Sequence, residues 1–153
     1  MTFALDTNIL AYVEGVNGAA RETASRELIA QLPEALGIVP LQALGELYNV
    51  LTRKAAWPAD RAREAVLAWR DSFASMPTTT TAMLEALDLA ADHRLSIWDS
   101  VMVCVAAESG CRLLLSEDMQ NGFTWRGVTV INPFASPQHP LLASLLEVGA
   151  DEQ

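Results

Sequence analysis

The chain has 153 residues, a length that suits one domain, and 51% of them are hydrophobic, which excludes a largely disordered protein. Ten basic residues stand against 19 acidic ones, and the resulting net charge of −9 excludes a basic protein that coats nucleic acid. An enzyme that acts on nucleic acid is not excluded, because metal-binding carboxylates also add negative charge.

Cysteines and apolar stretches indicate the compartment. Cys104 and Cys111 would lie about 10 Å apart along a shared helix, too far for a disulfide. Residues 1–10 contain no Lys or Arg and reach Asp6 too early for a secretory signal. The longest uncharged stretch, 127–146, contains prolines at 133, 137 and 140. We therefore expect no membrane span and a cytoplasmic protein.

Short apolar runs alternate along the chain with longer amphipathic segments. In chain order, the sequence predicts a strand at 3–5, helices at 9–14 and 19–31, a strand at 37–40, helices at 41–54 and 58–72, a candidate strand at 76–81, helices at 81–93 and 96–109, and strands at 112–115 and 128–131. Continuously hydrophobic strands that alternate with helices are typical of a parallel sheet covered on both faces. We predict an α/β fold with a central, mainly parallel sheet of four to five strands flanked by helices.

The predicted elements end near residue 134, so the sequence divides into a domain, 1–134, and a C-terminal tail, 135–153. The pattern indicates no core role for the tail, which is a candidate for loose order.

Acidic residues fall where a parallel sheet binds its ligands. Asp6 directly follows the first strand, and Asp118 lies three residues beyond the end of the strand at 112–115. Asp99 opens the buried helix at 96–109, and Glu46 lies inside the helix that follows the second strand. Carboxylates that converge without a basic partner need a cation, and hard divalent cations prefer oxygen ligands. This pattern indicates Mg²⁺ or Mn²⁺ and chemistry on phosphate esters.

Each acid also has a purely structural interpretation. Asp6 could cap the following helix, and Ser96 with Asp99 has the spacing of a capping box. Glu46 lies away from the apolar face of its helix, as a solvated glutamate would, and Asp118 could belong to an ordinary turn. Spacing alone leaves both interpretations open.

Four segments, taken in order, carry a resemblance to a known family. They are LDTNIL at 5–10, GELYNVL at 45–51, LSIWDS at 95–100 and LLSEDMQ at 114–120. They resemble the ordered motifs of PIN-domain ribonucleases, most closely those of bacterial toxins of the VapC type, and VTVINPF at 128–134 is similar to their final strand. The resemblance covers residues 2 to about 134. It implies a PIN-like domain that acts as a Mg²⁺- or Mn²⁺-dependent endoribonuclease.

The resemblance also implies roles for individual residues. Asp6, Glu46, Asp99 and Asp118 match the family's catalytic and metal-binding acids, with Asp6 and Asp99 as direct ligands. Asn8, Ser116 and Glu117 match supporting positions: Asn8 supports the first acid, Ser116 stands where Thr is more common, and Glu117 competes with Asp118 for the place nearest the metal. Since a metal-activated water is the nucleophile in such chemistry, we expect no catalytic role for His93 or His139.

Basic residues indicate where a substrate could bind. Arg53, Lys54, Arg61 and Arg63 cluster between two predicted helices, either as a rim that contacts RNA phosphates or as a solvated helix end. The resemblance further implies an antitoxin partner and a homodimer, for which the helices at 19–31 and 41–54 offer candidate faces.

Two other function classes compete with the ribonuclease. An aspartate-nucleophile phosphatase would carry a second acid where this chain has Asn8. A non-catalytic PIN-fold interaction module would not need all four acids.

Overall fold

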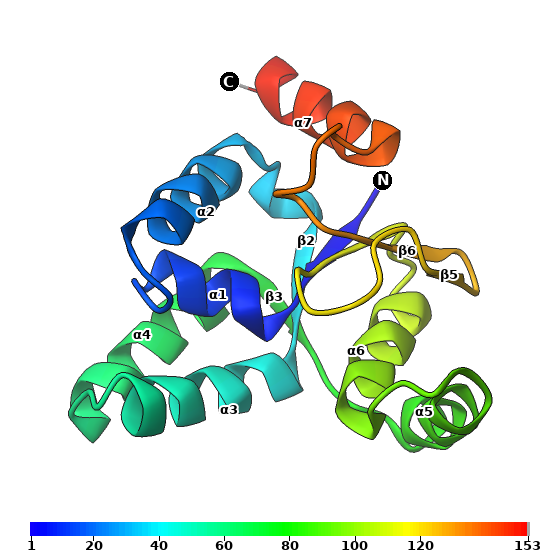
Figure 1. Ribbon diagram of the computed structural model, residues 1–153, viewed down its shortest axis with the longest axis horizontal. Helices are drawn as coiled ribbons and strands as arrows, with labels where there is room; N and C mark the ends of the chain where they lie inside the picture. Colours follow the sequence, from blue (N-terminus) through cyan, green and yellow to red (C-terminus); the bar gives the residue numbers. More distant parts are fainter. Residues whose placement is uncertain (153) are drawn as a thin grey trace.

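The computed structural model describes residues 1–152, and residue 153 of the expected tail lies outside the described residues. A six-stranded sheet forms the centre of the fold (Figure 1). In chain order its strands are β1 (Phe3–Leu5), β2 (Gly37–Pro40), β3 (Ala74–Met76), β4 (Leu113–Leu115), β5 (Thr124–Trp125) and β6 (Val128–Ile131). Across the sheet the order is β3-β2-β1-β4-β6-β5, and every neighbouring pair is parallel except β5 and β6. The predicted α/β class with a mainly parallel sheet is confirmed.

The sixth strand, β5, was not predicted because it contains only two residues. It pairs with β6 through a two-residue turn, Arg126 and Gly127, which both have positive φ. Tight hairpin turns require this conformation, but the sequence lacks the Asn-Gly or Asp-Gly pair that usually signals it.

Helices cover both faces of the sheet. Their bounds are α1 (Thr7–Val13), α2 (Ala19–Gln31), α3 (Leu41–Asn49), α4 (Ala59–Ser72), α5 (Thr80–His93), α6 (Ile97–Glu108) and α7 (Pro140–Asp151). Figure 1 shows α1 and α2 on one side of the strands and α5 and α6 on the other. The helix predicted at 41–54 is instead α3 followed by a π-helical turn, η2 (Val50–Lys54), and a 3₁₀ turn, η1 (Glu34–Leu36), precedes β2.

The core lies between the central strands and α6. All of β1 and β4 is buried, and so are residues 100–106 of α6, as its nearly all-apolar sequence predicted. Cys104 and Cys111 are both buried and both free, in agreement with the expectation of no disulfide.

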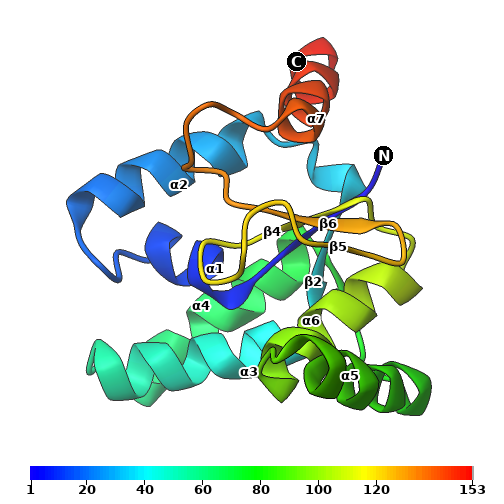
Figure 2. The ribbon, with the colours of Figure 1, turned by 45° about the vertical axis from the view of Figure 1, so that its right-hand side comes forward.

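The C-terminal tail differs from its expected loose order. Residues 140–151 form α7, which lies beside α2 in Figure 2 and buries Leu142 and Leu145. The two helices approach closely, since a Cβ atom on Gly149 would lie 2.1 Å from the Gln31 carbonyl oxygen. The helix was not predicted because several prolines precede it. Pro140 nevertheless occupies the first helical position, which proline favours, and His139 Nδ1 accepts a hydrogen bond from the Leu141 N–H at 3.1 Å.

Among residues 1–152, no helix is both long enough and apolar enough to cross a lipid bilayer.

Candidate functional site

Asp6 lies at the carboxyl edge of the sheet, where β1 and β4 end in register. Leu5 pairs with Leu115, so the residues that follow, Asp6 and Ser116, emerge side by side. Asp6 is only 4% exposed; its Oδ1 accepts the Thr7 N–H at 2.8 Å and its Oδ2 accepts the Ser116 hydroxyl at 2.7 Å. Asp6 therefore caps α1, and the capping role that the sequence suggested for this residue is confirmed.

Electrostatics distinguish Asp6 from an ordinary cap. Burial is the main cause that raises its pKa to about 7, and the negative charges of Asp99 and Glu46 raise it further. The hydrogen bonds from Ser116 and Thr7 oppose this shift only in part. An acid that is this costly to ionise, with two further acids close enough to act on it, is a candidate functional residue and a candidate ligand for a cation.

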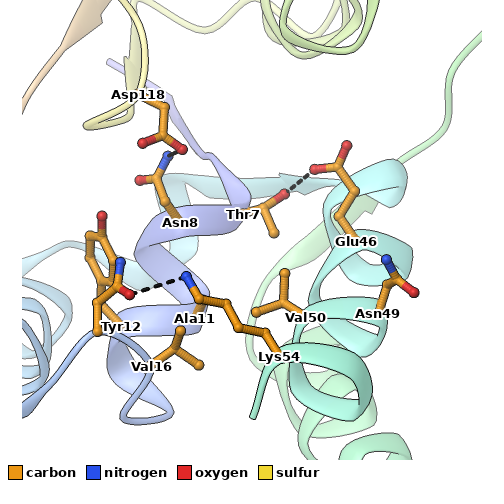
Figure 3. Close-up of a pocket in the computed structure, with 11 residues that line it drawn as sticks. Thr7, Asn8, Ala11, Tyr12, Val16, Glu46, Asn49, Val50, Lys54 and Asp118 are labelled. Carbon is orange, nitrogen blue, oxygen red and sulfur yellow. Dashed lines mark hydrogen bonds between the residues drawn. The ribbon is translucent and has the colours of Figure 1, made fainter. Parts of the chain in front are cut away.

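Asn8 connects the loops that follow β1 and β4. Its Nδ2 lies 3.3 Å from Asp6 Oδ2 and 3.2 Å from Ser116 Oγ. The same Nδ2 lies 3.1 Å from Asp118 Oδ2 (Figure 3). Its Oδ1 accepts the Glu117 N–H at 3.2 Å, and this contact sets which side of the amide faces the acids. The Ser116 hydroxyl also accepts the Asp118 N–H at 3.2 Å.

Glu46 is half-buried rather than a freely solvated glutamate. The Thr7 hydroxyl donates to its Oε2 at 2.5 Å, and the Gln42 amide donates to its Oε1 at 2.9 Å. Both oxygens are thus held toward the carboxyl end of β1, although Glu46 belongs to α3.

Asp99 lies in the first turn of α6, where Ser96 caps the helix and accepts the Asp99 N–H at 3.0 Å. The capping role that the spacing suggested for Ser96 is therefore present. Burial raises the pKa of Asp99, the charges of Asp118 and Glu46 raise it further, and a hydrogen bond with Ser96 acts in the opposite direction. Asp99 therefore lies close enough to Asp118 and Glu46 to feel their negative charges.

Glu117 and Asp118 are neighbours with different partners. Glu117 forms an ion pair with Arg21 and accepts the Tyr12 hydroxyl at 2.7 Å. Burial raises the pKa of Glu117, but the hydrogen bonds from Arg21 and Tyr12 outweigh it and hold that pKa below its ordinary value. Asp118 is exposed and bonds Asn8. Nothing in the sequence singled out Arg21, which lies on a surface helix 96 residues from its partner.

A cleft of about 400 Å³ opens beside these acids, between α1 and α3 (Figure 3). It is lined by Thr7, Asn8, Ala11, Tyr12, Val16, Asn17, Glu46, Asn49, Val50, Lys54 and Asp118.

Of the four basic residues predicted to contact substrate, the structure brings Lys54 to this cleft. The Arg61 guanidinium instead lies over the Trp57 ring, 3.7 Å from its centroid. Arg63 lines a separate apolar groove between α3 and α4, and Arg53 is exposed outside the cleft lining.

The acids suit a hard divalent cation by their chemistry. Within residues 1–152, none of the four carboxylates forms an ion pair. No three acidic, histidine or cysteine side chains in that range converge into a cluster of metal ligands by themselves. Mg²⁺ commonly takes only one or two carboxylates and fills its remaining positions with water and substrate phosphate. Four carboxylates without an ion-pair partner, of which Asp6 and Asp99 have raised pKa values, fit that mode of binding.

Comparisons with known proteins identify the fold. Among solved structures, the chain is similar to VapC20 of Mycobacterium tuberculosis, described as a toxin that cleaves the sarcin-ricin loop, with a TM-score of 0.65 and 22% identity over 76% of this chain and 90% of that one. It is also similar to a toxin–antitoxin complex from Klebsiella pneumoniae (TM-score 0.64, 16% identity, 87% of this chain and 98% of that one). A third neighbour is VapBC2 of Rickettsia felis bound to a promoter DNA fragment (TM-score 0.63, 12% identity, 86% and 98%).

Likenesses at these identities show the fold alone, and no curated protein matches the sequence. The family model of the PIN domain matches residues 3–121, a span that contains all four acids. The chain therefore belongs to the PIN domain family.

Proposed function

We propose that the protein is an endoribonuclease that requires Mg²⁺ or Mn²⁺ and serves as the toxin of a toxin–antitoxin pair. One observation carries the nuclease proposal: Asp6, Glu46, Asp99 and Asp118 act on one another electrostatically at the carboxyl edge of the sheet, and within residues 1–152 none of them forms an ion pair. The PIN domain family and the fold shared with VapC toxins support the same activity.

The proposed division of labour follows from the hydrogen bonds. Asp6 and Asp99 would hold the cation directly, and Glu46 and Asp118 would complete its acidic surroundings. Ser116 and Asn8 orient Asp6, since both contact its Oδ2. Thr7 holds Glu46 toward the same place. When bound, the cation supplies an activated water and neutralises charge on the phosphate.

No side-chain nucleophile or histidine base takes part in this scheme. His93 packs edge-on against Phe123 with ring centroids 5.5 Å apart, and His139 caps α7. Both contacts agree with the expected non-catalytic roles.

The proposed partners are RNA, an antitoxin and a second copy of the chain in the cytoplasm. Two of the structural neighbours are toxin–antitoxin assemblies, which supports the antitoxin. An antitoxin segment would occupy the acidic cleft, with an arginine directed at the carboxylates. For the homodimer, α3 is the better of the two candidate faces, because Leu41 and Tyr48 are exposed beside an apolar groove.

A metal titration tests the nuclease. Purified protein should cleave a fluorogenic RNA with Mg²⁺ or Mn²⁺ and should lose this activity in excess chelator. Full activity in chelator would overturn the proposal.

A growth assay tests the toxin assignment separately. Expression of the wild type should slow growth, Asp6→Asn should not, and co-expression of the neighbouring gene should relieve the effect. If the wild type and the variant slow growth equally, the toxin assignment fails, while the nuclease proposal is judged by the metal titration.

A further inference from the structure

The cleft between α1 and α3 carries opposite charges at its two ends. Glu46 and Asp118 lie at the end next to Asp6, and Lys54 reaches in from the other end (Figure 3). Among the residues that line the cleft, Lys54 is the single cation. An ammonium in the cleft of a chain with net charge −9 indicates a ligand that carries negative charge away from the acids.

The π-helical turn places Lys54 in this cleft. In an α-helix, a step of four residues goes about 40° beyond one full turn, so positions 46, 50 and 54 would drift around the helix. In the π turn, the Ala55 N–H bonds the Val50 carbonyl five residues back, at 3.1 Å, and each residue rotates the chain by less. The smaller rotation in the π turn offsets the excess rotation of the α-helical step. As a result, Glu46, Val50 and Lys54 all line the cleft.

A neutral residue holds the lysine in its present position. Lys54 Nζ donates to Asn17 Oδ1 at 3.2 Å, and Asn17 adopts a φ of 68°, which asparagine tolerates better than most residues. A neutral amide does not cancel the charge of the ammonium, and Lys54 is exposed. The lysine can therefore exchange this bond for one to an anion.

The middle of the cleft suits a nucleoside. Ala11, Val16 and Val50 provide apolar surface on which a base or ribose can pack, and the Asn17 and Asn49 amides offer both hydrogen-bond donors and acceptors. A volume of about 400 Å³ lies within the range of sites that hold one small organic group.

We propose that this cleft is a substrate subsite that holds a nucleoside next to the bond to be cleaved, with the flanking phosphate on Lys54. The scissile phosphate then lies at the acidic end and the neighbouring phosphate at the basic end, so the two charges set the direction of the RNA strand. This inference rests on the proposed ribonuclease function and names the residues that position its substrate.

Salt-dependent binding tests the subsite apart from cleavage. The probe is a 5′-fluorescein-labelled RNA hexamer of mixed sequence, followed by fluorescence anisotropy with Ca²⁺ in place of Mg²⁺. Each phosphate contact to single-stranded nucleic acid contributes about 0.7 to the slope of log affinity against log salt. Lys54→Met should therefore lower the slope by about 0.7 and weaken binding, while Lys54→Arg should retain the slope.

The matched control removes the same charge elsewhere. Arg112 is exposed and directly precedes β4, at the edge of the sheet opposite the acids, so Arg112→Met should leave the slope at the wild-type value. Equal slopes for Lys54→Met and Arg112→Met, or no binding of the hexamer by the wild type, would overturn the subsite. Binding that depends on Lys54 without cleavage in Mg²⁺ would show that the cleft binds RNA, but it would overturn the nuclease and with it the assignment of the cleft as a substrate subsite. Cleavage in Mg²⁺ together with RNA binding that does not depend on Lys54 would support the nuclease and overturn the subsite.

Discussion

The acidic site has a strand side and a helix side, and the two are built differently. On the strand side, Asp6, Asn8, Ser116 and Asp118 form a continuous hydrogen-bonded set that joins the loops after β1 and β4. On the helix side, Glu46 and Asp99 project from α3 and α6, and Asp99 acts on the other acids through charge alone. The register of the sheet thus pre-organises the strand side. On the helix side, hydrogen bonds from Thr7 and Gln42 hold Glu46, while Asp99 is linked to the other acids only by charge.

The most severe way to break the strand side is Asp6→Asn. Asparagine can still cap α1, so the fold should persist, but the buried carboxylate that we assign to the cation is lost. We expect RNA cleavage to fall to background, measured by single-turnover cleavage beside a thermal melt of the same sample. Retained cleavage by the folded variant would show that Asp6 is only a cap.

Removal of the Ser116 hydroxyl should have the next largest effect. Ser116→Ala deletes the donor to Asp6 and the acceptor of the Asp118 N–H. The loss of a group that orients a metal ligand commonly costs about 10–100-fold in metal affinity or activity, and we expect a loss of that size. Ser109→Ala is the control, because Ser109 caps the C-terminal end of α6 and its hydroxyl donates to the Val105 carbonyl. Equal activity of the two variants would contradict the pre-organised strand side.

The helix side predicts a gain rather than a loss of stability. The pKa of Asp99 is raised in the fold, so its ionised form opposes folding once the pH exceeds the ordinary carboxyl pKa. In chelator at pH 7, Asp99→Asn should therefore melt at a higher temperature than the wild type. The gain should vanish as the pH falls below the ordinary carboxyl pKa, because both side chains are then neutral. An equal or lower midpoint at pH 7 would show that Asp99 acts chiefly in the first turn of α6.

Glu117 should give the smallest effect, which sharpens the contrast with its neighbour. Glu117→Gln loses a partly exposed ion pair with Arg21, and such pairs contribute about 0–1 kcal/mol. Cleavage and metal affinity should stay within a few-fold of the wild type, whereas Asp118→Asn should reduce both. The reverse order in a metal titration of the two variants would show that Glu117 is the residue nearer the cation.

The strand side could be predicted from the sequence because it follows from the ends of strands. Parallel strands that end in register place Asp6 and Ser116 together. Reading the apolar runs as strands was enough to place Asp6 at this edge, whereas the role of Ser116 came from the family resemblance. Asp118 lies in the same loop after β4 as Ser116. For Glu46, helical periodicity alone favoured a solvated position, and only the family resemblance brought it into the site.

The remaining features depend on side-chain directions and tertiary contacts that no local pattern carries. The ion pair between Arg21 and Glu117 joins residues 96 positions apart in the sequence. The position of Lys54 in the cleft depends on a π-helical turn within a segment whose sequence predicts one continuous helix. Helix α7 was missed for a different reason: prolines before it suggested an irregular tail, while its leucines pack in the interior.

Mn²⁺ binding, followed by electron paramagnetic resonance, tests whether the acids hold a divalent cation. Loss of the free Mn²⁺ signal on addition of protein measures binding without any need for RNA. We expect the wild type and Glu117→Gln to bind Mn²⁺ with similar affinity, and Asp6→Asn and Asp99→Asn to bind it at least tenfold more weakly. Equal Mn²⁺ binding by the wild type and Asp6→Asn would contradict the account.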